Sequence, residues 1–387
     1  MHGANLVSAM LRQAPDADCE GLGGPRMAAA GMKLRCNLAG RAIMGFAEVA
    51  KSFPYIRRVF LDTIRHLERT QPDCLVTIDY PGFNMRLARR AKAMGIPVVY
   101  YISPQVWAWK RKRIYTIARS VDKMLVILPF EETMYREIGV DCIYVGHPLF
   151  DQIEQASLTG MFKNGMLIGI FPGSRDQEIR RLLRVMLEVA EGIRKTHPEA
   201  RFIAPCVDEQ RERQVHASAG RFPLQTVIGK AYEVLTAAQF CLVASGTATL
   251  ETALFGVPMV ILYRTAPLNY WIARRLVHIE HIGLANILAG RGIVPEFIQE
   301  DASAQRILPA ALELIDDTPR RAAMICDLAE VRAKLGGPGA SARAASEILK
   351  LMTTKQVVSP FEGGIAGDVD GGSAKGDTIR DQAKRKV

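Results

Sequence analysis

The stretch Ile168-Gly-Ile-Phe-Pro-Gly-Ser-Arg175 decides the fold class. Its apolar residues are typical of a buried strand, a Pro-Gly turn ends that strand, and a long amphipathic helical pattern follows over roughly residues 177–195. A strand that passes through a tight turn into a helix is the repeating unit of parallel sheets. The stretch therefore predicts an α/β protein.

The same alternation of strand and helix patterns continues through most of the chain and predicts two doubly wound, Rossmann-like domains. The polar stretch 151–165 is the predicted linker between them. We expect a first domain over residues 1–155, a second over 156–355, and a glycine-rich, disordered tail over 356–387. The strand patterns lie at residues 74–78, 98–102, 123–128, 142–145, 167–171, 201–205, 240–244 and 259–263.

Composition excludes some classes of protein and leaves others open. The 387 residues include 50 Lys and Arg against 40 Asp and Glu, a formal net charge of +10. This charge favours an anionic partner without choosing among nucleic acid, an acidic lipid surface and a phosphorylated substrate. No apolar run reaches the roughly 18 residues of a transmembrane helix, and no secretory signal is visible, so we expect a cytoplasmic protein. The seven cysteines are scattered singly, which predicts reduced side chains and no zinc site.

Two turns of the predicted second domain carry residues suited to phosphate. At the first, Ser174 can cap the following helix, and Arg175 would add a charge to the free N–H groups there. A simple capped turn explains this segment equally well. At the second, Ser245, Gly246 and Thr247 again stand between a strand and a helix. Two such turns in one domain favour a nucleotide diphosphate site.

Glu251 stands one turn into the helix that follows the second of these turns. A carboxylate there can accept hydrogen bonds from the two hydroxyls of a ribose. Taken alone, a glutamate at such a position is more often a solvated helix residue.

In the first domain, Asp79 is predicted at the carboxyl end of a strand, where α/β proteins bind their ligands. A carboxylate there can act as a general base. In the alternative interpretation, Asp79 and Asn84 cap a helix over residues 85–93.

Farther on, Trp107 and Trp109 precede the basic run 110–113. This segment fits an anionic membrane interface, and it equally fits core tryptophans beneath a basic helix start.

Two further features have an ordinary structural reading. His147 lies where the first domain ends, and a lone histidine there is more often a structural hydrogen-bonding group than a catalyst. The apolar stripe of Ile56, Phe60, Ile64 and Leu67 has helical spacing, and such stripes usually belong to a core.

Taken together, these segments resemble the lipid-A-disaccharide synthase family, which are inverting glycosyltransferases with the GT-B fold, two domains facing across a cleft. The resemblance covers nearly everything before the tail. Its matching segments are residues 24–27, 44–45, 78–84, 103–109, 128–131, 146–147, 172–175, 245–251, 286–290 and 337–341.

The resemblance implies a reaction in the biosynthesis of lipid A. Lipid A is the lipid part of lipopolysaccharide. UDP-2,3-diacylglucosamine would be joined to 2,3-diacylglucosamine 1-phosphate through a β-1,6 linkage, with release of UDP. Asp79 would be the base for the attacking 6-hydroxyl, and Arg175 with the helix N-termini would stabilise the departing UDP. No metal or cofactor is required if Arg175 and the helix N-termini stabilise the departing UDP. The acyl chains imply a peripheral position on the cytoplasmic face of the inner membrane, against its anionic surface.

The resemblance also assigns residues to each substrate. Those expected to line the UDP pocket are Ser245, Gly246, Thr247, Glu251 and Asn286, and Ser174 at the first turn is a further substrate-binding residue. Those expected to face the acceptor or the membrane are Asn84, Trp107 and residues 44–60, with His147 as a further substrate-binding residue.

The main departure from the family is at the N-terminus. Family members usually begin with a strand and a Gly-Glu-x-Ser-Gly-Asp loop, whereas this sequence begins with a helical pattern over residues 3–13. We therefore expect the first strand of the domain to be missing and translation to start upstream. A smaller departure is Ala285, where the family often has proline.

Two other functions compete with this interpretation. A UDP-N-acetylglucosamine 2-epimerase would share the UDP site, although it has no lipid acceptor to explain the tryptophans and the basic run. A non-catalytic protein that binds nucleic acid or anionic membrane would explain the charge. Its basic residues are, however, spread over many segments with no recognised nucleic-acid module, so we expect no nucleic-acid partner. The sequence leaves the oligomeric state open, a homodimer included.

Overall fold

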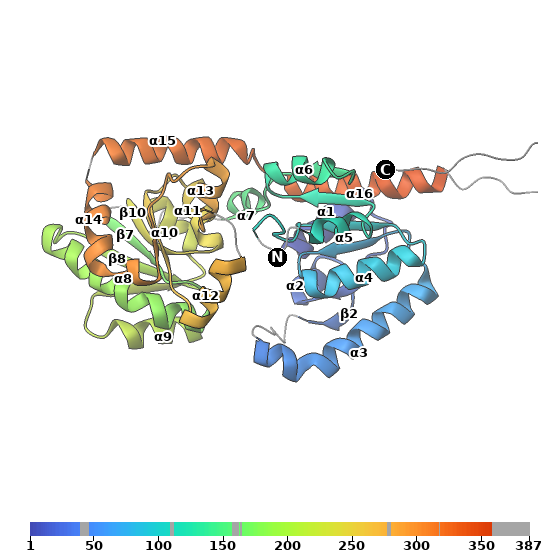
Figure 1. Cartoon of the computed structure of the whole chain (residues 1–387), viewed down its shortest axis with the longest axis horizontal. Helices are drawn as coiled ribbons and strands as arrows, with labels where there is room; N and C mark the ends of the chain where they lie inside the picture. Colours follow the sequence, from blue (N-terminus) through green and yellow to red (C-terminus); the bar gives the residue numbers. More distant parts are fainter. Residues whose placement is uncertain are drawn as a thin grey trace, which may run out of the picture.

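Parallel strands and their connecting helices form two lobes that lie side by side (Figure 1). The computed structural model describes residues 1–38, 46–108, 112–156, 162, 165–276, 280–316 and 318–357. The predicted tail from residue 358 onward therefore lies outside the described residues.

The first lobe is built from the first half of the chain. Its elements are α1 (His2–Gln13), β1 (Glu20–Gly23), α2 (Pro25–Ala29), β2 (Lys33–Asn37), α3 (Phe46–Thr70), β3 (Leu75–Ile78), α4 (Pro81–Ala93), β4 (Val98–Tyr101), α5 (Arg113–Ala118), β5 (Lys123–Val126), α6 (Pro129–Arg136) and β6 (Cys142–Tyr144).

The second lobe follows the helix α7 (Leu149–Gln155), which lies between the lobes in Figure 1. Its elements are β7 (Leu167–Phe171), α8 (Asp176–Thr196), β8 (Arg201–Cys206), α9 (Glu209–Ala219), β9 (Leu224–Ile228), α10 (Ala231–Ala237), β10 (Phe240–Ala244), α11 (Thr247–Leu254), β11 (Met259–Tyr263), α12 (Pro267–Leu276), α13 (Leu284–Ala289), β12 (Glu296–Ile298), the 3-10 turn η1 (Gln299–Asp301), α14 (Ala304–Ile315) and α15 (Pro319–Lys334). The last described helix is α16 (Ala340–Val357).

The second lobe contains one six-stranded parallel sheet with the order β12-β11-β10-β7-β8-β9. The chain proceeds from β7 outward to β9, returns to the middle and proceeds outward again from β10. Strand order therefore reverses between β7 and β10, which pair with Phe171 opposite Val243. Ligands of doubly wound folds bind at the carboxyl ends of the strands at such a reversal.

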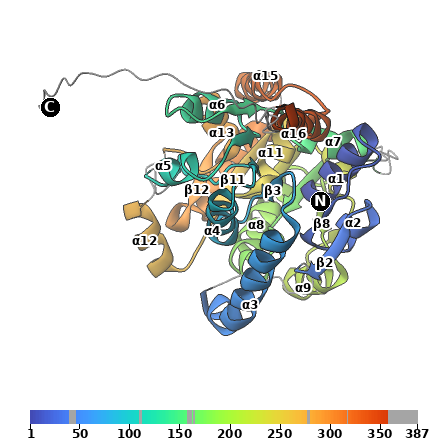
Figure 2. The same ribbon diagram turned by 90° about the vertical axis from the view of Figure 1, so that its right-hand side faces the viewer.

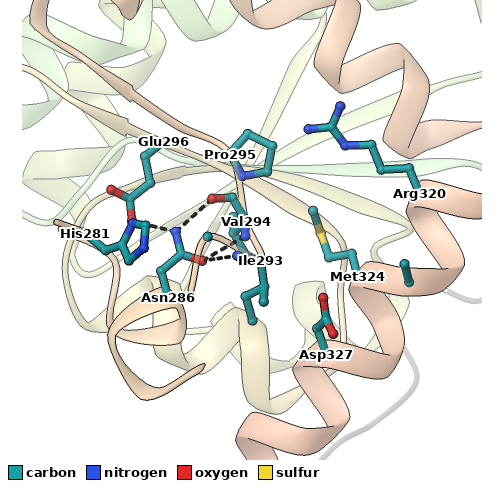
Figure 3. Close-up of a pocket in the computed structure, with 11 residues that line it drawn as sticks. His281, Asn286, Ile293, Val294, Pro295, Glu296, Arg320, Met324 and Asp327 are labelled. Carbon is teal, nitrogen blue, oxygen red and sulfur yellow. Dashed lines mark hydrogen bonds between the residues drawn. The ribbon is translucent and has the colours of Figure 1, made fainter. Parts of the chain in front are cut away.

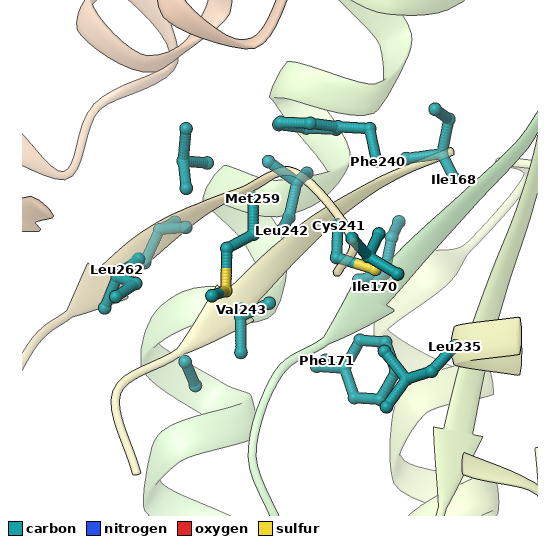
Figure 4. Packing of buried hydrophobic residues seen from close by; sticks show 14 of the residues in the cluster. Ile168, Ile170, Phe171, Leu235, Phe240, Cys241, Leu242, Val243, Met259 and Leu262 are labelled. Carbon is teal, nitrogen blue, oxygen red and sulfur yellow. The ribbon is translucent and has the colours of Figure 1, made fainter. Parts of the chain in front are cut away.

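Helices cover both faces of this sheet, so its central strands are apolar along their whole length. Every residue of β7 and of β10 is buried. Figure 4 shows Ile168 and Ile170 of β7 beside Phe240 and Leu242 of β10, which form the middle of the core. Sequence therefore predicts these strands well, because a continuous apolar run is what a doubly covered strand requires.

The described strands of the first lobe form two parallel sheets, β1-β2 and β3-β4-β5-β6. We predicted one doubly wound sheet for this domain. Strand β2 alternates exposed and half-buried residues, so it has no apolar run by which its sequence would reveal it.

Helix α16 packs on the first lobe although the chain reaches it from the second, and it lies beside α1 in both views (Figures 1 and 2). Ala344, Ala345 and Ile348 are buried in one cluster with Leu6 and Ala9 of α1. The domain that we predicted to end at residue 355 thus gives its last helix to the other lobe. The physical reason is that the apolar residues of α16 are removed from water where they pack against those of α1.

Asp151 of α7 fixes the start of α16. Its carboxylate accepts hydrogen bonds from the backbone N–H groups of Gly339, Ala340 and Ser341, at 2.6, 3.2 and 3.0 Å. The side chain is 6% exposed. The stretch predicted as a polar linker therefore begins with a buried residue that joins two helices.

Among the described residues, no helix combines the length and the apolar character needed to cross a membrane.

Replacing Asp151 by Asn should destabilise the protein. One oxygen of the amide can still accept, but its NH₂ group would face backbone donors, so at least one buried N–H group loses its acceptor. We expect the free energy of unfolding, measured by urea denaturation, to fall by about 1–3 kcal/mol. The matched control is Asp16→Asn at an exposed position, which should change it by less than about 0.5 kcal/mol. Equal effects of the two substitutions would contradict the assignment.

Candidate active site

The two predicted turns follow β7 and β10, so they lie next to each other at the strand-order reversal. At the first, Gly173 has φ +101°, and a side chain there would collide with Glu178. The Glu178 carboxylate accepts from the Arg175 backbone N–H at 3.2 Å and from its guanidinium at 3.1 Å. The predicted cap by Ser174 is wrong, because the side chain of Glu178 reaches back to this helix start. Ser174 is exposed and its carbonyl accepts from Arg211.

Arg175 remains accessible in this arrangement. Its side chain is 66% exposed and is held on the surface by Glu178. Such a surface pair is weak, so an anion can compete for the guanidinium.

The second turn presents backbone and small hydroxyls to open space. Ser245 donates its N–H to Leu262 at 2.9 Å, which extends the pairing of β10 with β11 by one residue. Gly246 and Thr247 are exposed, and no described atom lies within 4 Å of the place where a Cβ of Gly246 would stand. A ligand can therefore approach the backbone closely here.

Glu251 is held inside the lobe, so it is not the solvated helix residue that sequence alone suggested. Its side chain accepts a hydrogen bond from the Tyr232 hydroxyl at 3.2 Å. The same hydroxyl is 3.4 Å from the amide oxygen of Gln152 on α7. Burial raises the pKa of Glu251, and the hydrogen bond from Tyr232 opposes this rise.

Asn286 is fully buried and pins the loop before β12. Its oxygen accepts from the N–H groups of Ile293 and Val294 at 2.9 and 2.8 Å. Its NH₂ group donates to the Val294 carbonyl and to Glu296, at 2.8 and 2.7 Å (Figure 3). Every donor and acceptor of the amide is thus bonded to the chain itself.

This amide forms part of the wall of a cavity of about 410 Å³, with α15 on the opposite side. Asn286 therefore shapes the pocket instead of offering a free amide to a ligand. The cavity is also lined by His281, by the carboxylates of Glu296 and Asp327 and by Arg320.

Asp79 lies at the carboxyl end of β3 with its side chain exposed. Its φ of +47° is uncommon for a non-glycine residue. Three contacts hold this backbone: its N–H bonds to Tyr101 at 3.1 Å, and its carbonyl accepts from Tyr100 and Asn84 at 2.8 and 2.7 Å. The arrangement fixes where the carboxylate projects.

The capping alternative for Asp79 and Asn84 is wrong, because α4 begins at Pro81 and not at residue 85. Asn84 lies inside the first turn and donates to the carbonyls of Ile78 and Asp79. Its amide orients the end of β3 and does not cap the helix.

His147 lies just after β6 and is 5% exposed. Its Nδ1 accepts from the Leu149 N–H at 3.3 Å, so Nε2 carries the hydrogen of the neutral ring. Burial lowers the pKa of His147 to about 4, and the nearby His2 adds to the effect. Burial also lowers the pKa of His2, where Asp79 acts in the opposite direction. His2, the first residue of α1, therefore interacts electrostatically with Asp79 at the end of β3 and with His147 after β6.

Trp107 is half-buried, and its Nε1–H donates to Glu131 at 3.2 Å. Its ring meets Phe130 edge-on at 5.4 Å. This favours the core reading for this tryptophan. Residues 109–111, which carry most of the predicted interfacial patch, lie outside the described residues.

Glu131 is a buried carboxylate that the sequence analysis did not single out. It is 1% exposed, and burial raises its pKa to about 7. In the sequence it resembles an ordinary acidic residue in the first turn of a helix, so nothing there revealed its burial.

The outer side of α3 is basic. The predicted stripe is confirmed as core, since Ile56, Phe60, Ile64 and Leu67 pack into the first lobe. On the other side, Phe53 is 54% exposed. A shallow pocket of about 340 Å³ is lined there by Pro54, Arg57, Arg58, Leu61, Asp62 and Arg65.

The described residues contain no cluster of His, Cys, Asp and Glu that could hold a metal ion. Metal independence of the chemistry stays a prediction.

Two lobes of parallel sheet, with polar turns at the strand-order reversal of one and a carboxylate at a strand end of the other, define an α/β protein of the GT-B class. Within that class the sequence is specific: the chain belongs to the lipid-A-disaccharide synthetase family, whose pattern matches residues 1–348. It is therefore an enzyme.

Relatives of known name support this membership. The lipid-A-disaccharide synthase of Syntrophus aciditrophicus is 41% identical over 362 residues, which cover 91% of this chain and 94% of the relative. That of Geobacter metallireducens is 40% identical over 365 residues, with 92% and 95% covered.

Solved structures share the fold at low identity. The S. aureus MnaA–UDP co-structure has a TM-score of 0.62 at 12% identity and covers 91% of this chain and 95% of that one. The kitacinnamycin glycotransferase has a TM-score of 0.60 at 16% identity, with 91% and 96% covered. A UDP-N-acetylglucosamine 2-epimerase from Listeria monocytogenes, described as putative, scores 0.58 at 13% identity, with 92% and 94% covered. These likenesses show the fold alone.

Replacing Asn286 by Ala should destabilise the loop before β12. The N–H groups of Ile293 and Val294 would lose their buried acceptor. We expect the free energy of unfolding to fall by about 2–4 kcal/mol in urea denaturation, because two buried donors lose a partner. Gln210→Ala, at an exposed position of α9, is the control and should leave the midpoint almost unchanged. A near-neutral N286A would show that water replaces the amide.

Proposed function

We propose that this enzyme transfers the sugar of UDP-2,3-diacylglucosamine to the 6-hydroxyl of 2,3-diacylglucosamine 1-phosphate. The products are the β-1,6-linked disaccharide 1-phosphate of lipid A and UDP. Family membership over residues 1–348 is the observation that carries the proposal. The names of the relatives support it, since they are about 40% identical over nearly their whole length.

The donor would bind at the strand-order reversal of the second lobe. Its diphosphate would meet the open backbone of the turn at Gly246 and the accessible guanidinium of Arg175. Glu251 would accept hydrogen bonds from the ribose hydroxyls, with Tyr232 holding the carboxylate in place. Backbone N–H groups and an arginine would then stabilise the charge of the departing UDP.

The acceptor would bind at the strand ends of the first lobe. The 6-hydroxyl oxygen attacks the anomeric carbon as the bond to UDP breaks, which inverts the configuration. Asp79 is the base that takes the hydroxyl proton, because its backbone is fixed and its carboxylate is exposed. His147, neutral with a hydrogen on Nε2, is suited to donate to an oxygen of the substrate.

The acyl chains of both substrates require access to a membrane surface. The basic outer side of α3, with the exposed Phe53, supports a peripheral position on the anionic cytoplasmic face of the inner membrane.

That the protein forms a homodimer stays a prediction. Sedimentation velocity of the purified protein tests it.

Replacing Asp79 by Asn should abolish most of the activity. The amide keeps the shape of the side chain but cannot take a proton, so we expect kcat to fall by about 100-fold or more. The KM for the donor should change by less than about twofold. The assay follows disaccharide formation and UDP release from the two purified substrates.

Asp73→Asn is the matched control, because Asp73 is an exposed carboxylate just before the same strand. Activity of D79N within about tenfold of the unchanged enzyme would assign the base elsewhere. Conversion of UDP-N-acetylglucosamine to its manno epimer, without disaccharide formation, would replace the proposed function by that of an epimerase.

Replacing Glu251 by Ala should weaken UDP binding by about 10–100-fold in titration calorimetry, since hydrogen bonds to a charged group are lost. Glu188→Ala, on the exposed side of α8, is the control and should bind UDP normally. Unchanged affinity in E251A would place the ribose elsewhere.

A further inference from the structure

We infer that Glu131 is a positioning residue, which holds Trp107 and the loop 102–108 in the arrangement that acceptor binding requires. The inference rests on the proposed function only in naming the acceptor; the positioning itself follows from the contacts of the loop.

The Glu131 carboxylate joins two segments of the first lobe. One oxygen accepts from Trp107 Nε1–H at 3.2 Å, and the other accepts from the backbone N–H of Leu128 at 3.3 Å. Leu128 immediately precedes α6, whereas Trp107 belongs to the loop after β4. One buried side chain therefore ties the loop to the start of the helix.

The same helix also holds the beginning of the loop. The Tyr135 hydroxyl lies 2.8 Å from the Ser103 hydroxyl. Ile102, just before it, has φ +66°, a left-handed conformation that is strained for a β-branched residue. The loop is thus kept in a conformation that its own backbone disfavours, and α6 supplies contacts at both of its ends.

Trp107 links this loop to the junction of the lobes. With Phe130 it packs against the buried cluster that includes Leu149 and Phe150 at α7 and continues into the second lobe. A change in the hold on Trp107 therefore acts where the two lobes meet, beside the loop of the first lobe that the proposed acceptor would face.

The groups that face Glu131 are neutral near pH 7. On α6 itself, burial raises the pKa of Tyr135, and on β6 burial raises the pKa of Cys142 to about 12. From the loop, the uncharged side chains of Ser103 and Trp107 face the carboxyl, and the backbone N–H groups of Ile127 and Leu128 face it from the turn before α6.

Ionisation of Glu131 is therefore coupled to its hydrogen bonds. Burial raises the pKa of Glu131 to about 7. As a carboxylate it accepts from both Trp107 and Leu128. Once the carboxyl is protonated, the oxygen that bears the hydrogen is a weaker acceptor, so one of the two bonds is weakened. The hold on the loop should be firm above pH 7 and looser below it.

The first test observes Trp107 directly. In the full chain carrying Trp109→Phe and Trp271→Phe, Trp107 is the remaining one of the three tryptophans. Its emission should titrate with a midpoint near pH 7 between about pH 5.5 and 8.5 and should be flat after Glu131→Gln is added. His147 does not interfere, because its pKa of about 4 lies below this range. Identical titrations with and without Glu131→Gln, or none in either, would overturn the inference.

The second test separates positioning from a purely structural role. In otherwise unchanged enzyme, E131Q and Trp107→Phe should each raise the KM for the acceptor by about tenfold, the effect of one hydrogen bond, with the donor KM within about twofold. Each should also remove the loss of kcat/KM below pH 7. The double variant should be no worse than either single one. Glu132→Gln, the next residue on α6, paired with Arg136 on the surface, is the matched control.

Failures of the two proposals can be told apart. If the unchanged enzyme makes no disaccharide, the proposed function is wrong, and the emission titration alone decides about Glu131. If circular dichroism shows that E131Q does not fold, W107F decides: an unchanged acceptor KM and pH profile would overturn the inference, and the expected changes would support it.

Discussion

A parallel sheet must be covered on both faces, and this constraint determines where the second lobe can bind anything. Helices occupy the faces, so the accessible backbone is at the strand ends. The chain places β7 beside β10, which brings together two turns that are some seventy residues apart in the sequence. The open backbone at Gly246 and the exposed Arg175 lie at the same edge of the sheet as a direct result of strand order. The placement of these two turns therefore depends on a core made of Ile168, Ile170, Phe240 and Leu242.

Three carboxylates with little or partial exposure accept hydrogen bonds from backbone N–H groups at helix starts. The buried Asp151 does this at α16, the buried Glu131 at α6 and the half-buried Glu296 at α13. Such a carboxylate also stands in the positive end of the helix dipole, which offsets part of the cost of burying its charge. Asp151 reaches the start of α16 from α7, and Glu296 reaches the start of α13 from β12. Glu131 lies on α6 itself and also binds Trp107 of the loop after β4. The same device thus caps helices and fastens distant parts of the chain together.

Sequence patterns predicted the parts of the fold that local chemistry determines. Continuous apolar runs identified β7 and β10, whereas β2 and β12 were missed because they are short and half-exposed. The turns were placed correctly, but the cap at Ser174 was not, since α8 begins one residue later, with Arg175 as its N-cap, and Glu178 accepts from the Arg175 N–H. The burial of Glu131 and the contacts of Tyr232 with Gln152 and Glu251 depend on segments far apart along the chain. A single sequence gives no distance between such segments, so these parts of the site required the structure.

The return of α16 to the first lobe has a consequence for how the chain acquires its shape during synthesis. The cluster that buries Leu6 and Ala9 is completed by Ala344, Ala345 and Ile348, which leave the ribosome more than three hundred residues later. The second lobe has all of its strands before that point. A segment made early is thus among the last to be fully covered, and an apolar surface of α1 stays exposed while the residues between α1 and α16 are translated. Such a nascent chain is a natural client for chaperones that shield early segments.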